Sequence, residues 1–358
     1  MASAFHSLEI RDVRHETDDA VAIAFNLPAN GGADFSYLPG QFLTLKTEID
    51  GEEVRRSYSI CSAPGEPLKV GVKKVEGGAF STFAQTLKPG DRLDVMPPDG
   101  RFTLDAEPLN ARHILLIGAG SGITPLLSIA SWLLEKEPHS SVTLVYGNRE
   151  TRTIMFREAL EDLKDRYLER LEVFHILSRE PQDVALFNGR ITAALIEEMT
   201  ESGLIAPGLS DQVFLCGPAE MTETVRDHLT AINVPDAKIH VELFTPADGA
   251  HPKARSEAAV AAAEKGVAVD VILDGLKKSF VIDDPEDTVL AAATKAGLDL
   301  PFSCAGGMCA TCRCKVVEGA AEMDINYSLA DWEQEQGYIL SCQAHPVSDK
   351  IVLDFDAV

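Results

Sequence analysis

Residues 113–130, HILLIGAGSGITPLLSIA, pass from an apolar run through a glycine-rich turn into a helix-like stretch. Gly118, Gly120 and Gly122 allow a tight turn, and Pro125 suits the first turn of a helix. The backbone N–H groups at the start of such a helix can face a diphosphate. The spacing departs from the usual G-x-G-x-x-G fingerprint. By itself, the stretch therefore predicts a strand, a nucleotide-binding turn and a helix.

The same alternation continues toward the C-terminus. Apolar runs of strand length are followed by helix-like stretches, as in VTLVYG before TIMFREALEDLKDRY and QVFLCG before AEMTETVRDHLTAI. The last strand-like run is KIHVELF, which ends at Phe244. A series of βαβ units predicts a parallel sheet with helices on both faces. We therefore expect an α/β domain at 107–244.

Toward the N-terminus, residues 1–106 have a different pattern. Short β-type runs such as LEIRDVRH, AVAIAFNL and QFLTLKTEI are separated by proline and glycine turns, which is typical of a small antiparallel barrel. In RRSYSICS, Arg56 and Tyr58 share one face of a strand, and Ser59 follows. These side chains offer a cation for a phosphate, an aromatic face for a flat ring, and a hydroxyl group.

A second glycine-containing run, GVKKVEGGAFSTF, follows in the same region. Its glycines, Gly77 and Gly78, would let the backbone approach a pyrophosphate. The hydroxyl groups of Ser81 or Thr82 would hydrogen-bond to that pyrophosphate. The two runs together predict that the barrel binds a nucleotide.

After Phe244, the segment 245–266 lacks periodicity and predicts a linker, although its alanine-rich half can be transiently helical. A compact unit follows at 267–358. Two strand-like runs come first, and then a helix in DTVLAAATKAG, with Asp287 as its N-cap and Gly297 as its stop.

Four of the seven cysteines lie in CAGGMCATCRC, which begins at Cys304. With Cys309 and Cys312, Cys304 gives the spacing C-x4-C-x2-C, and Cys342 lies farther along the chain. This is the plant-type [2Fe–2S] pattern. Zinc suits four cysteines equally well, but zinc sites usually pair one C-x2-C with another. Cys314 falls outside the set, and we expect a buried thiol there.

The composition excludes some functions. The chain has 358 residues, 45% of them hydrophobic, and a formal net charge of -24, so nucleic acid would be repelled. Residues 267–358 carry 16 acidic and 6 basic residues, which serve either solubility or docking to a basic partner. The N-terminus has no basic head followed by an apolar stretch, and no run is long enough to span a bilayer, which predicts a cytoplasmic protein.

Over residues 5–244, the order of these motifs with Cys216-Gly217-Pro218 resembles the ferredoxin–NADP reductase superfamily. The resemblance implies an FAD-binding barrel followed by a nicotinamide dinucleotide domain. For FAD it implies Arg56, Tyr58, Ser59, Val72, Lys73, Gly78, Ser81 and Thr82. For the dinucleotide it implies Gly118, Gly120, Gly122, Thr124, Asn148, Arg149, Ser178, Arg179, Gly217 and Pro218.

The same resemblance implies a catalytic group of Ser59, Cys216, Glu242 and Phe244. Cys216 would lie beside the nicotinamide, or it is a buried thiol at a strand end. The run VELF is similar to the V-E-V-Y terminus of plant reductases, with Phe244 in place of the tyrosine that covers the flavin. Because the chain continues beyond this point, core packing is the alternative role for Phe244.

The choice of dinucleotide follows from the ends of two predicted strands. NADH sites usually offer an acid to the ribose, whereas a 2′-phosphate calls for arginine and hydroxyl donors. Asn148-Arg149 follows the second strand, and Ser178-Arg179-Glu180 follows the third and resembles the F-S-R-E of NADP-dependent reductases. We therefore expect NADPH.

The block from Asp299 to Cys342 resembles plant-type ferredoxins, which implies a β-grasp fold and transfer of single electrons. The whole chain resembles the family of reductase subunits of phenylacetyl-CoA 1,2-epoxidase complexes, including GYILSCQA and the terminal VLDFDA. This implies electron transfer from NADPH through FAD and the [2Fe–2S] cluster to diiron oxygenase subunits. The reductase of 3-ketosteroid 9α-hydroxylase, which serves a Rieske oxygenase, is an alternative, and a zinc-stapled nucleotide sensor without turnover is another.

Overall fold

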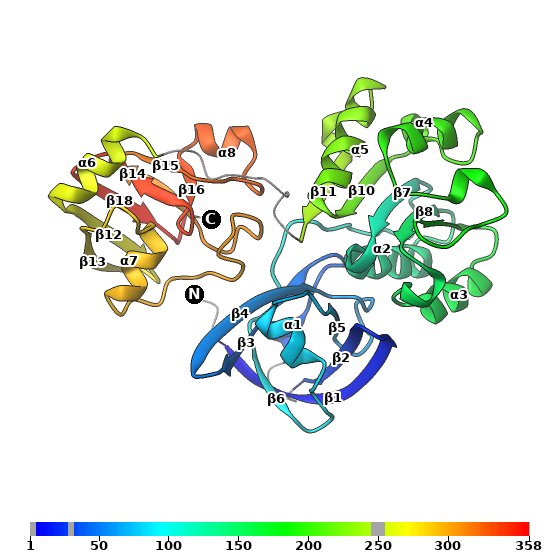
Figure 1. Ribbon diagram of the computed structural model, residues 1–358, viewed down its shortest axis with the longest axis horizontal. Helices are drawn as coiled ribbons and strands as arrows, with labels where there is room; N and C mark the ends of the chain where they lie inside the picture. Colours follow the sequence, from blue (N-terminus) through cyan, green and yellow to red (C-terminus); the bar gives the residue numbers. More distant parts are fainter. Residues whose placement is uncertain (1–4, 28–31, 245–254, 358) are drawn as a thin grey trace. The chain divides into compact units, whose positions relative to one another are not determined.

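The computed structural model describes residues 5–27, 32–244 and 255–357 (Figure 1). The described chain divides into two compact units, residues 5–244 and residues 255–357. The first unit holds an antiparallel and a parallel sheet, and the second holds a mixed sheet. Among the described residues, no helix has the length and apolar character needed to cross a membrane.

Six antiparallel strands form the first sheet, in the order β4-β3-β6-β1-β2-β5. Beside it lies the short helix α1, Ala79–Ala84. A β-bridge between Ile60, just after β4, and Val70 on β5 joins the two edges, so the predicted antiparallel barrel is confirmed. The strands are β1 His6–Thr17, β2 Ala20–Asn26, β3 Phe42–Ile49, β4 Glu52–Ser59, β5 Lys69–Lys73 and β6 Arg92–Val95.

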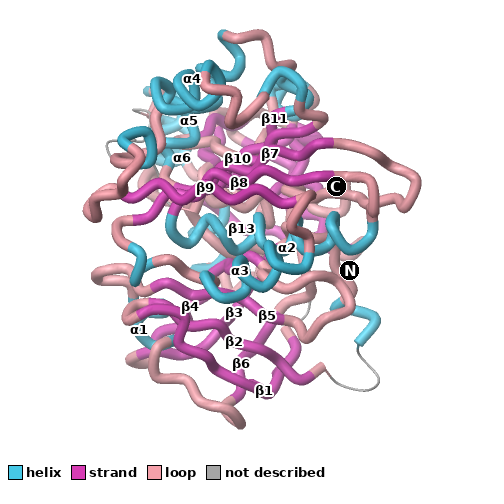
Figure 2. The backbone as a smooth tube through the Cα atoms, turned by 90° about the vertical axis from the view of Figure 1, so that its right-hand side faces the viewer, coloured by secondary structure: helices cyan, strands magenta, loops and turns pink. Residues whose placement is uncertain are grey.

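Five parallel strands form the second sheet, in the order β11-β10-β7-β8-β9, which confirms the predicted βαβ series. Helices α2 and α3 pack on one face, and α4 and α5 on the other (Figure 2). The strands are β7 His113–Ala119, β8 Ser141–Asn148, β9 Leu171–Leu177, β10 Gln212–Gly217 and β11 Ile239–Leu243. The helices are α2 Ile123–Lys136, α3 Arg157–Arg166, α4 Ala193–Glu201 and α5 Ala219–Ala231.

The barrel and the α/β domain share one apolar core. Ala22 and Phe102 from the barrel region are buried with side chains of α2 and α3. On β5, Gly71 lies so close to its neighbours that a Cβ atom there would be 2.7 Å from Thr124 and 2.9 Å from Phe156. The two domains therefore pack tightly at this seam.

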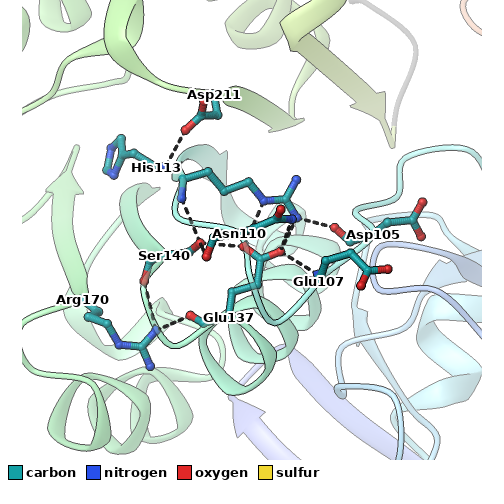
Figure 3. A network of polar contacts seen from close by, with 9 residues as sticks. Asp105, Glu107, Asn110, His113, Glu137, Ser140, Arg170 and Asp211 are labelled. Atoms are coloured by element: carbon teal, nitrogen blue, oxygen red, sulfur yellow. Dashed lines mark hydrogen bonds and ion pairs between the residues drawn. The ribbon is translucent and has the colours of Figure 1, made fainter.

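A buried carboxylate anchors the connection between these two domains (Figure 3). The side chain of Glu137, just after α2, has no exposed surface and accepts hydrogen bonds from Arg112, Ser140, Asn110 and the Glu107 N–H. Burial alone would raise the pKa of Glu137, but these donors outweigh it and lower the pKa to about 2. The carboxylate therefore stays charged and holds the connecting segment against the end of α2.

The second unit contains a mixed sheet in the order β13-β12-β18-β14-β16, in which β12 and β18 are parallel. A two-stranded sheet, β15-β17, accompanies it, and α7 packs on β13 and β17. This arrangement agrees with the predicted β-grasp fold. The elements are β12 Val267–Leu273, β13 Leu276–Ile282, β14 Arg313–Glu318, β15 Ala321–Met323, β16 Tyr338–Leu340, β17 Ala344–Pro346, β18 Lys350–Asp354, α6 Glu257–Lys265, α7 Val289–Lys295 and α8 Asp331–Glu335.

The structure differs from two local predictions. The N-cap of α7 is Thr288, not Asp287, because the Thr288 hydroxyl accepts the Ala291 N–H while the Asp287 carboxylate pairs with Lys295 at 2.7 Å. Gly297 ends this helix as predicted, with a φ of 75°.

The second difference concerns the predicted linker 245–266, of which 245–254 lie outside the described residues. Its alanine-rich half is helix α6, which begins after the N-cap Ser256. Ala262 and Ala263 on this helix are buried in the core of the second unit. Burial of the small alanine face keeps this segment helical, which its intrinsic propensity alone would not ensure.

Candidate active site and iron–sulfur site

Three of the four predicted catalytic side chains come together at the ends of strands in the first unit. Ser59 ends β4, and its Oγ donates a hydrogen bond of 3.0 Å to Oε2 of Glu242 on β11. Cys216 on β10 is the register partner of Glu242. Ser59 and Cys216 are buried. The barrel and the parallel sheet each contribute to this group, so it forms only when the two domains pack together.

Burial sets the protonation of this group. Burial raises the pKa of Glu242 to about 8, and the hydrogen bond from Ser59 offsets part of that rise. Burial, and then the Glu242 charge, raise the pKa of the Cys216 thiol well above its usual value. At neutral pH the thiol is therefore protonated, whereas Glu242 can gain or release a proton.

Phe244 is the fourth predicted catalytic residue. It follows β11 directly, and its half-buried ring packs against the core that the barrel shares with the α/β domain. Phe244 therefore has the core-packing role that the sequence offered as an alternative. Coverage of a flavin by the same ring stays a prediction.

The predicted FAD residues lie on β4, β5 and the start of α1. Arg56 is exposed, and Tyr58 is half-buried with its ring centroid 5.4 Å from that of Phe80. Val72 is buried, while the Lys73 ammonium lies 3.5 Å from an oxygen of Asp19. An exposed cation beside a half-buried aromatic face is a suitable combination for a phosphate attached to a flat ring.

In the turn before α1, one of the two hydroxyl groups predicted to bind FAD is instead hydrogen-bonded within the turn. The Ser81 hydroxyl accepts the Val75 N–H at 3.0 Å and donates to the Gly78 carbonyl at 3.2 Å. A Cβ atom on Gly78 would lie 2.5 Å from Ser81 Oγ, so the turn needs glycine at this position. Thr82 is exposed. Ser81 therefore shapes the turn, and the exposed hydroxyl of Thr82 is the better placed to reach a ligand.

The glycine turn after β7 is tightly packed on one side and open on the other. A Cβ atom on Gly122 would lie 2.1 Å from the Cys216 carbonyl oxygen, and one on Gly118 would lie 2.5 Å from Leu126. Gly120 has a φ of 55°, and a Cβ atom there would meet nothing within 4 Å. Thr124 is buried. This open side is where a diphosphate can approach the backbone.

The predicted dinucleotide residues beyond this turn meet at one edge of the parallel sheet. The Ser178 N–H donates to the Asn148 carbonyl at 3.0 Å, and the Arg179 N–H donates to the Arg149 carbonyl at 2.8 Å. The side chains of Ser178, Arg149 and Arg179 are exposed. Gly217 ends β10, which is separated from β8 by β7, and Pro218 is the N-cap of α5; Gly217 is buried while Pro218 is exposed.

The four predicted ligand cysteines in the second unit lie together as two pairs. The neighbouring Cys309 thiol lowers the pKa of Cys304 to about 6, while Cys304 raises that of Cys309. The neighbouring Cys312 thiol lowers the pKa of Cys342, while Cys342 raises that of Cys312. No three Cys, His, Asp or Glu side chains in the described part of the chain group around a position for one metal ion. Two adjacent thiol pairs fit a cluster of two irons.

Backbone N–H groups of the cysteine loop turn toward these sulfurs. The Gly306 N–H lies 3.4 Å from the Cys304 sulfur, and the Cys304 N–H lies 3.5 Å from the Cys309 sulfur. Ala305 and Ala310 have φ values of 49° and 56°, in the left-handed region. Such alternation points successive N–H groups inward, which suits an anionic cluster.

Two residues near the loop complete its description. Cys314 is fully buried in the core on β14, as expected, and burial raises the pKa of its thiol. Gln343 was not predicted. Its amide donates to the Ala305 carbonyl at 3.1 Å and lies 3.7 Å from the Cys342 sulfur. Its position directly after Cys342 was the one signal for it in the sequence.

Three family models match the chain. The oxidoreductase FAD-binding domain matches residues 7–104, the oxidoreductase NAD-binding domain 116–227, and the 2Fe-2S iron-sulfur cluster binding domain 271–347. A subunit of the 1,2-phenylacetyl-CoA epoxidase of Escherichia coli is 43% identical over 99% of both chains. The ferredoxin reductase component of the 3-ketosteroid-9-alpha-monooxygenase of Mycobacterium tuberculosis is 34% identical over 98% of this chain and 95% of the relative.

The chain belongs to the oxygenase reductase family. A further member, the glycine betaine monooxygenase reductase subunit of Pseudomonas aeruginosa, is 32% identical over 99% of this chain and 96% of its own. Like other oxygenase reductases, this chain is an oxidoreductase with FAD-binding, NAD-binding and [2Fe–2S] domains. The sites described above fit these three groups, because each offers donors of the required chemistry.

Solved structures agree with this oxygenase reductase fold. Phthalate dioxygenase reductase aligns with a TM-score of 0.58 over 98% of both chains at 23% identity. The FAD/NAD-binding domain of the nitric oxide dioxygenase of Vibrio cholerae aligns with a TM-score of 0.59 over 69% of this chain and all of that chain. The predicted three-part fold is therefore confirmed.

Proposed function

We propose that this oxygenase reductase serves a phenylacetyl-CoA 1,2-epoxidase, and that it passes electrons from NADPH to a diiron oxygenase. The observation that carries the proposal is the 43% identity to the Escherichia coli epoxidase component over 99% of both chains. The 3-ketosteroid relatives match at 34% to 36%, so they are the second choice. We also propose domain boundaries at residues 106 and 244, and, in place of the predicted boundary at 266, a third domain that begins with α6, because Ala262 and Ala263 of this helix are buried in its core.

The order of the bound groups follows from their chemistry. When bound, FAD would supply the chemistry that converts the two electrons of a hydride into the single electrons that a [2Fe–2S] cluster requires. Arg56, Tyr58 and Thr82 would hold the FAD. Cys304 and Cys309 would bind one iron, and Cys312 and Cys342 the other, in accord with their pairing. Both cofactor sites thus lie in this chain.

Ser59 and Glu242 would manage the proton that accompanies hydride transfer. The Glu242 carboxyl has a pKa near 8 and is hydrogen-bonded to the Ser59 hydroxyl. A group with this pKa exchanges a proton close to neutral pH. Cys216 stays a neutral thiol beside it.

The dinucleotide would be NADPH. Ser178 and Arg179 are exposed side by side with Arg149 at the carboxyl edge of β8 and β9, and they offer hydroxyl and guanidinium donors to a 2′-phosphate. In a Ser178→Ala, Arg179→Ala variant, we expect kcat/KM for NADPH to fall about 10- to 100-fold, because two charge-assisted contacts are lost. The value for NADH should change less than about threefold, and equal losses for both would contradict the assignment.

The physiological role is tested by oxygen uptake. Purified oxygenase subunits from the same organism are mixed with NADPH and phenylacetyl-CoA, with and without this protein. Uptake that requires both this protein and the thioester supports the proposal. No uptake, with intact NADPH-dependent cytochrome c reduction, would contradict it and leave a reductase for another oxygenase, with the ketosteroid system next.

The acidic second unit would dock on a basic surface of the oxygenase. Residues 267–358 carry 16 acidic and 6 basic side chains. Attraction between opposite charges speeds encounter and is screened by salt. The concentration of this protein needed for half-maximal oxygen uptake should therefore rise between about 50 mM and 300 mM salt, while its reduction of ferricyanide changes little.

A further inference from the structure

A buried tyrosine outside the predicted site contacts the glycine turn after β7. Tyr146 lies on β8, and its side chain is fully buried in the core shared with the barrel. Its hydroxyl donates a hydrogen bond of 2.8 Å to the carbonyl oxygen of Gly120. Gly120 is the residue of the turn with the left-handed φ of 55°. The Gly120 carbonyl is therefore hydrogen-bonded to a side chain that is itself held in the core.

The same hydroxyl lies close to the backbone of the segment before α3. Burial raises the pKa of Tyr146, and the nearby N–H of Met155 offsets part of that rise. The next residue, Phe156, has a φ of 56°, and its N–H donates to Oε2 of Glu16 on the barrel at 3.2 Å. The Phe156 ring also packs against Gly71 on β5. Through Tyr146, the glycine turn is thus connected to the segment that contacts the barrel.

The conformation of this turn decides where its N–H groups point. A left-handed conformation at a single position is held by its surroundings, and it is free to relax when a supporting contact is lost. Steric contacts hold Gly122 against the Cys216 carbonyl, but a Cβ atom at Gly120 would meet nothing within 4 Å. The Gly120 carbonyl accepts the backbone N–H of Ile123 at the start of α2 and the hydroxyl of Tyr146. The hydrogen bond from Tyr146 is therefore the side-chain contact that helps to fix the orientation of the Gly120 peptide.

We propose that Tyr146 is a positioning residue for the dinucleotide, because its buried hydroxyl holds the Gly120 peptide in the orientation that binds the diphosphate. This inference rests on the proposed NADPH site at the glycine turn. Tyr146 does not touch the reacting atoms. Its removal should weaken binding of the dinucleotide in both the ground state and the transition state, and leave the chemical step at saturation nearly unchanged.

The test is a Tyr146→Phe variant of the full-length holoprotein, with NADPH as the probe and ferricyanide as the electron acceptor. We expect KM for NADPH to rise about tenfold and kcat to stay within about twofold, since one buried hydrogen bond is lost. FAD content should equal that of the wild type. Unchanged KM, or a kcat that falls by as much as kcat/KM, would overturn the proposal.

A matched control separates positioning from a general loss of stability. Tyr37 in the barrel is half-buried, and its hydroxyl donates to the Ala63 carbonyl at 2.7 Å. Tyr37→Phe should lower Tm by a similar amount and leave KM for NADPH unchanged. An equal rise of KM in both variants would contradict the inference.

A second variant tests the site on which the inference rests. A methyl group at Gly120 enters open space on the ligand side of the turn, so Gly120→Ala should raise KM for NADPH. If Gly120→Ala raises KM and Tyr146→Phe does not, only the role of Tyr146 is wrong. If neither variant changes KM, the glycine turn is not the dinucleotide site, and the proposed site and the inference both fail.

Discussion

The hydrogen bond between Ser59 and Glu242 illustrates how much a single residue depends on its surroundings. Glutamate has an ordinary pKa near 4.5, and burial at the end of β11 raises it to about 8. Ser59 comes from the barrel, and without its donor the carboxylate would be harder still to ionise. The pKa of the Glu242 carboxyl group therefore depends on how the barrel packs against the α/β domain.

The Glu242 carboxyl makes the stability of the first unit depend on pH. Because the folded-state pKa exceeds the unfolded value, the folded state binds the extra proton between pH 4.5 and 8, and stability falls as pH rises through this range. In a Glu242→Gln variant, this decrease of stability with rising pH should disappear. We expect the variant to gain about 2 kcal/mol relative to wild type between about pH 5.5 and 8.5, after allowance for partial exposure.

The measurement is Tm by calorimetry at several pH values on the holoprotein. Glu220→Gln is the control, because Glu220 is exposed in the first turn of α5. Its pH dependence should match that of the wild type. If Glu242→Gln keeps the wild-type slope, the carboxyl does not titrate near pH 8.

At the scale of elements, the end of α2 and the segment before β7 depend on one buried charge. Glu137 accepts hydrogen bonds from Arg112, Ser140 and Asn110, and Arg170 caps neighbouring carbonyls of the same turn (Figure 3). A carboxylate near a helix C-terminus is unfavourable for the helix dipole. The hydrogen bonds from these donors outweigh that cost, so the Glu137 network stabilises the junction between the barrel and the α/β domain.

Loss of the Glu137 charge should destabilise this junction. Glu137→Gln leaves the Arg112 guanidinium, 17% exposed, without its anion, and we expect a loss of about 2–4 kcal/mol at pH 7. The wild type should lose the same contribution as pH falls from 4.5 toward 2, because the folded-state pKa is depressed to about 2.

Thermal unfolding with release of FAD fluorescence measures both effects. Glu135→Gln in the last turn of α2 is the matched control, since Glu135 is exposed and its carboxylate pairs with the neighbouring Lys136. That variant should stay within about 0.5 kcal/mol of wild type. Equal losses in the two variants would show that the buried network contributes nothing specific.

At the scale of the whole molecule, the chain combines two electron sites in two compact units. The oxidoreductase domains occupy the first unit, and the cysteine pairs occupy the second. On the proposed electron path, reduction of the oxygenase needs both units, whereas oxidation of the nicotinamide dinucleotide needs only the first.

Replacement of a ligand cysteine should separate these two functions. Cys309→Ser should lose the visible [2Fe–2S] absorption and nearly all reduction of the oxygenase, because one iron loses a thiolate. Ferricyanide reduction with NADPH through the flavin should stay within about twofold of wild type. Optical spectra and the two assays on the same preparation check this outcome.

Cys314→Ala is the control for the ligand assignment. Cys314 is buried on β14 and belongs to neither thiol pair, so its alanine variant should keep the cluster spectrum. If Cys314→Ala loses the cluster as Cys309→Ser does, the set of four ligands is wrong. If Cys309→Ser still reduces the oxygenase, electrons do not pass through the cluster.

Local patterns predicted the elements well. Strand alternation, the βαβ series and the glycine turn before α2 have short-range causes, so they are visible in the sequence. The N-cap of α7 was placed one residue early, at Asp287 instead of Thr288, because both side chains can cap a helix and only the Lys295 contact decides between them. The α6 helix was predicted only as a transient helix in a linker, because its alanines gain their stability from burial.

The sequence by itself determined the three-part order of the chain and the chemistry of its sites, since cysteine spacing, glycine turns and the RxYS run act over a few residues. Only the tertiary structure decided the pairing of Cys304 with Cys309 and of Cys312 with Cys342, the raised pKa of Glu242, and the buried contacts of Glu137 and Tyr146. The physical reason is that these properties depend on burial and on partners far away in the sequence, which no local pattern records.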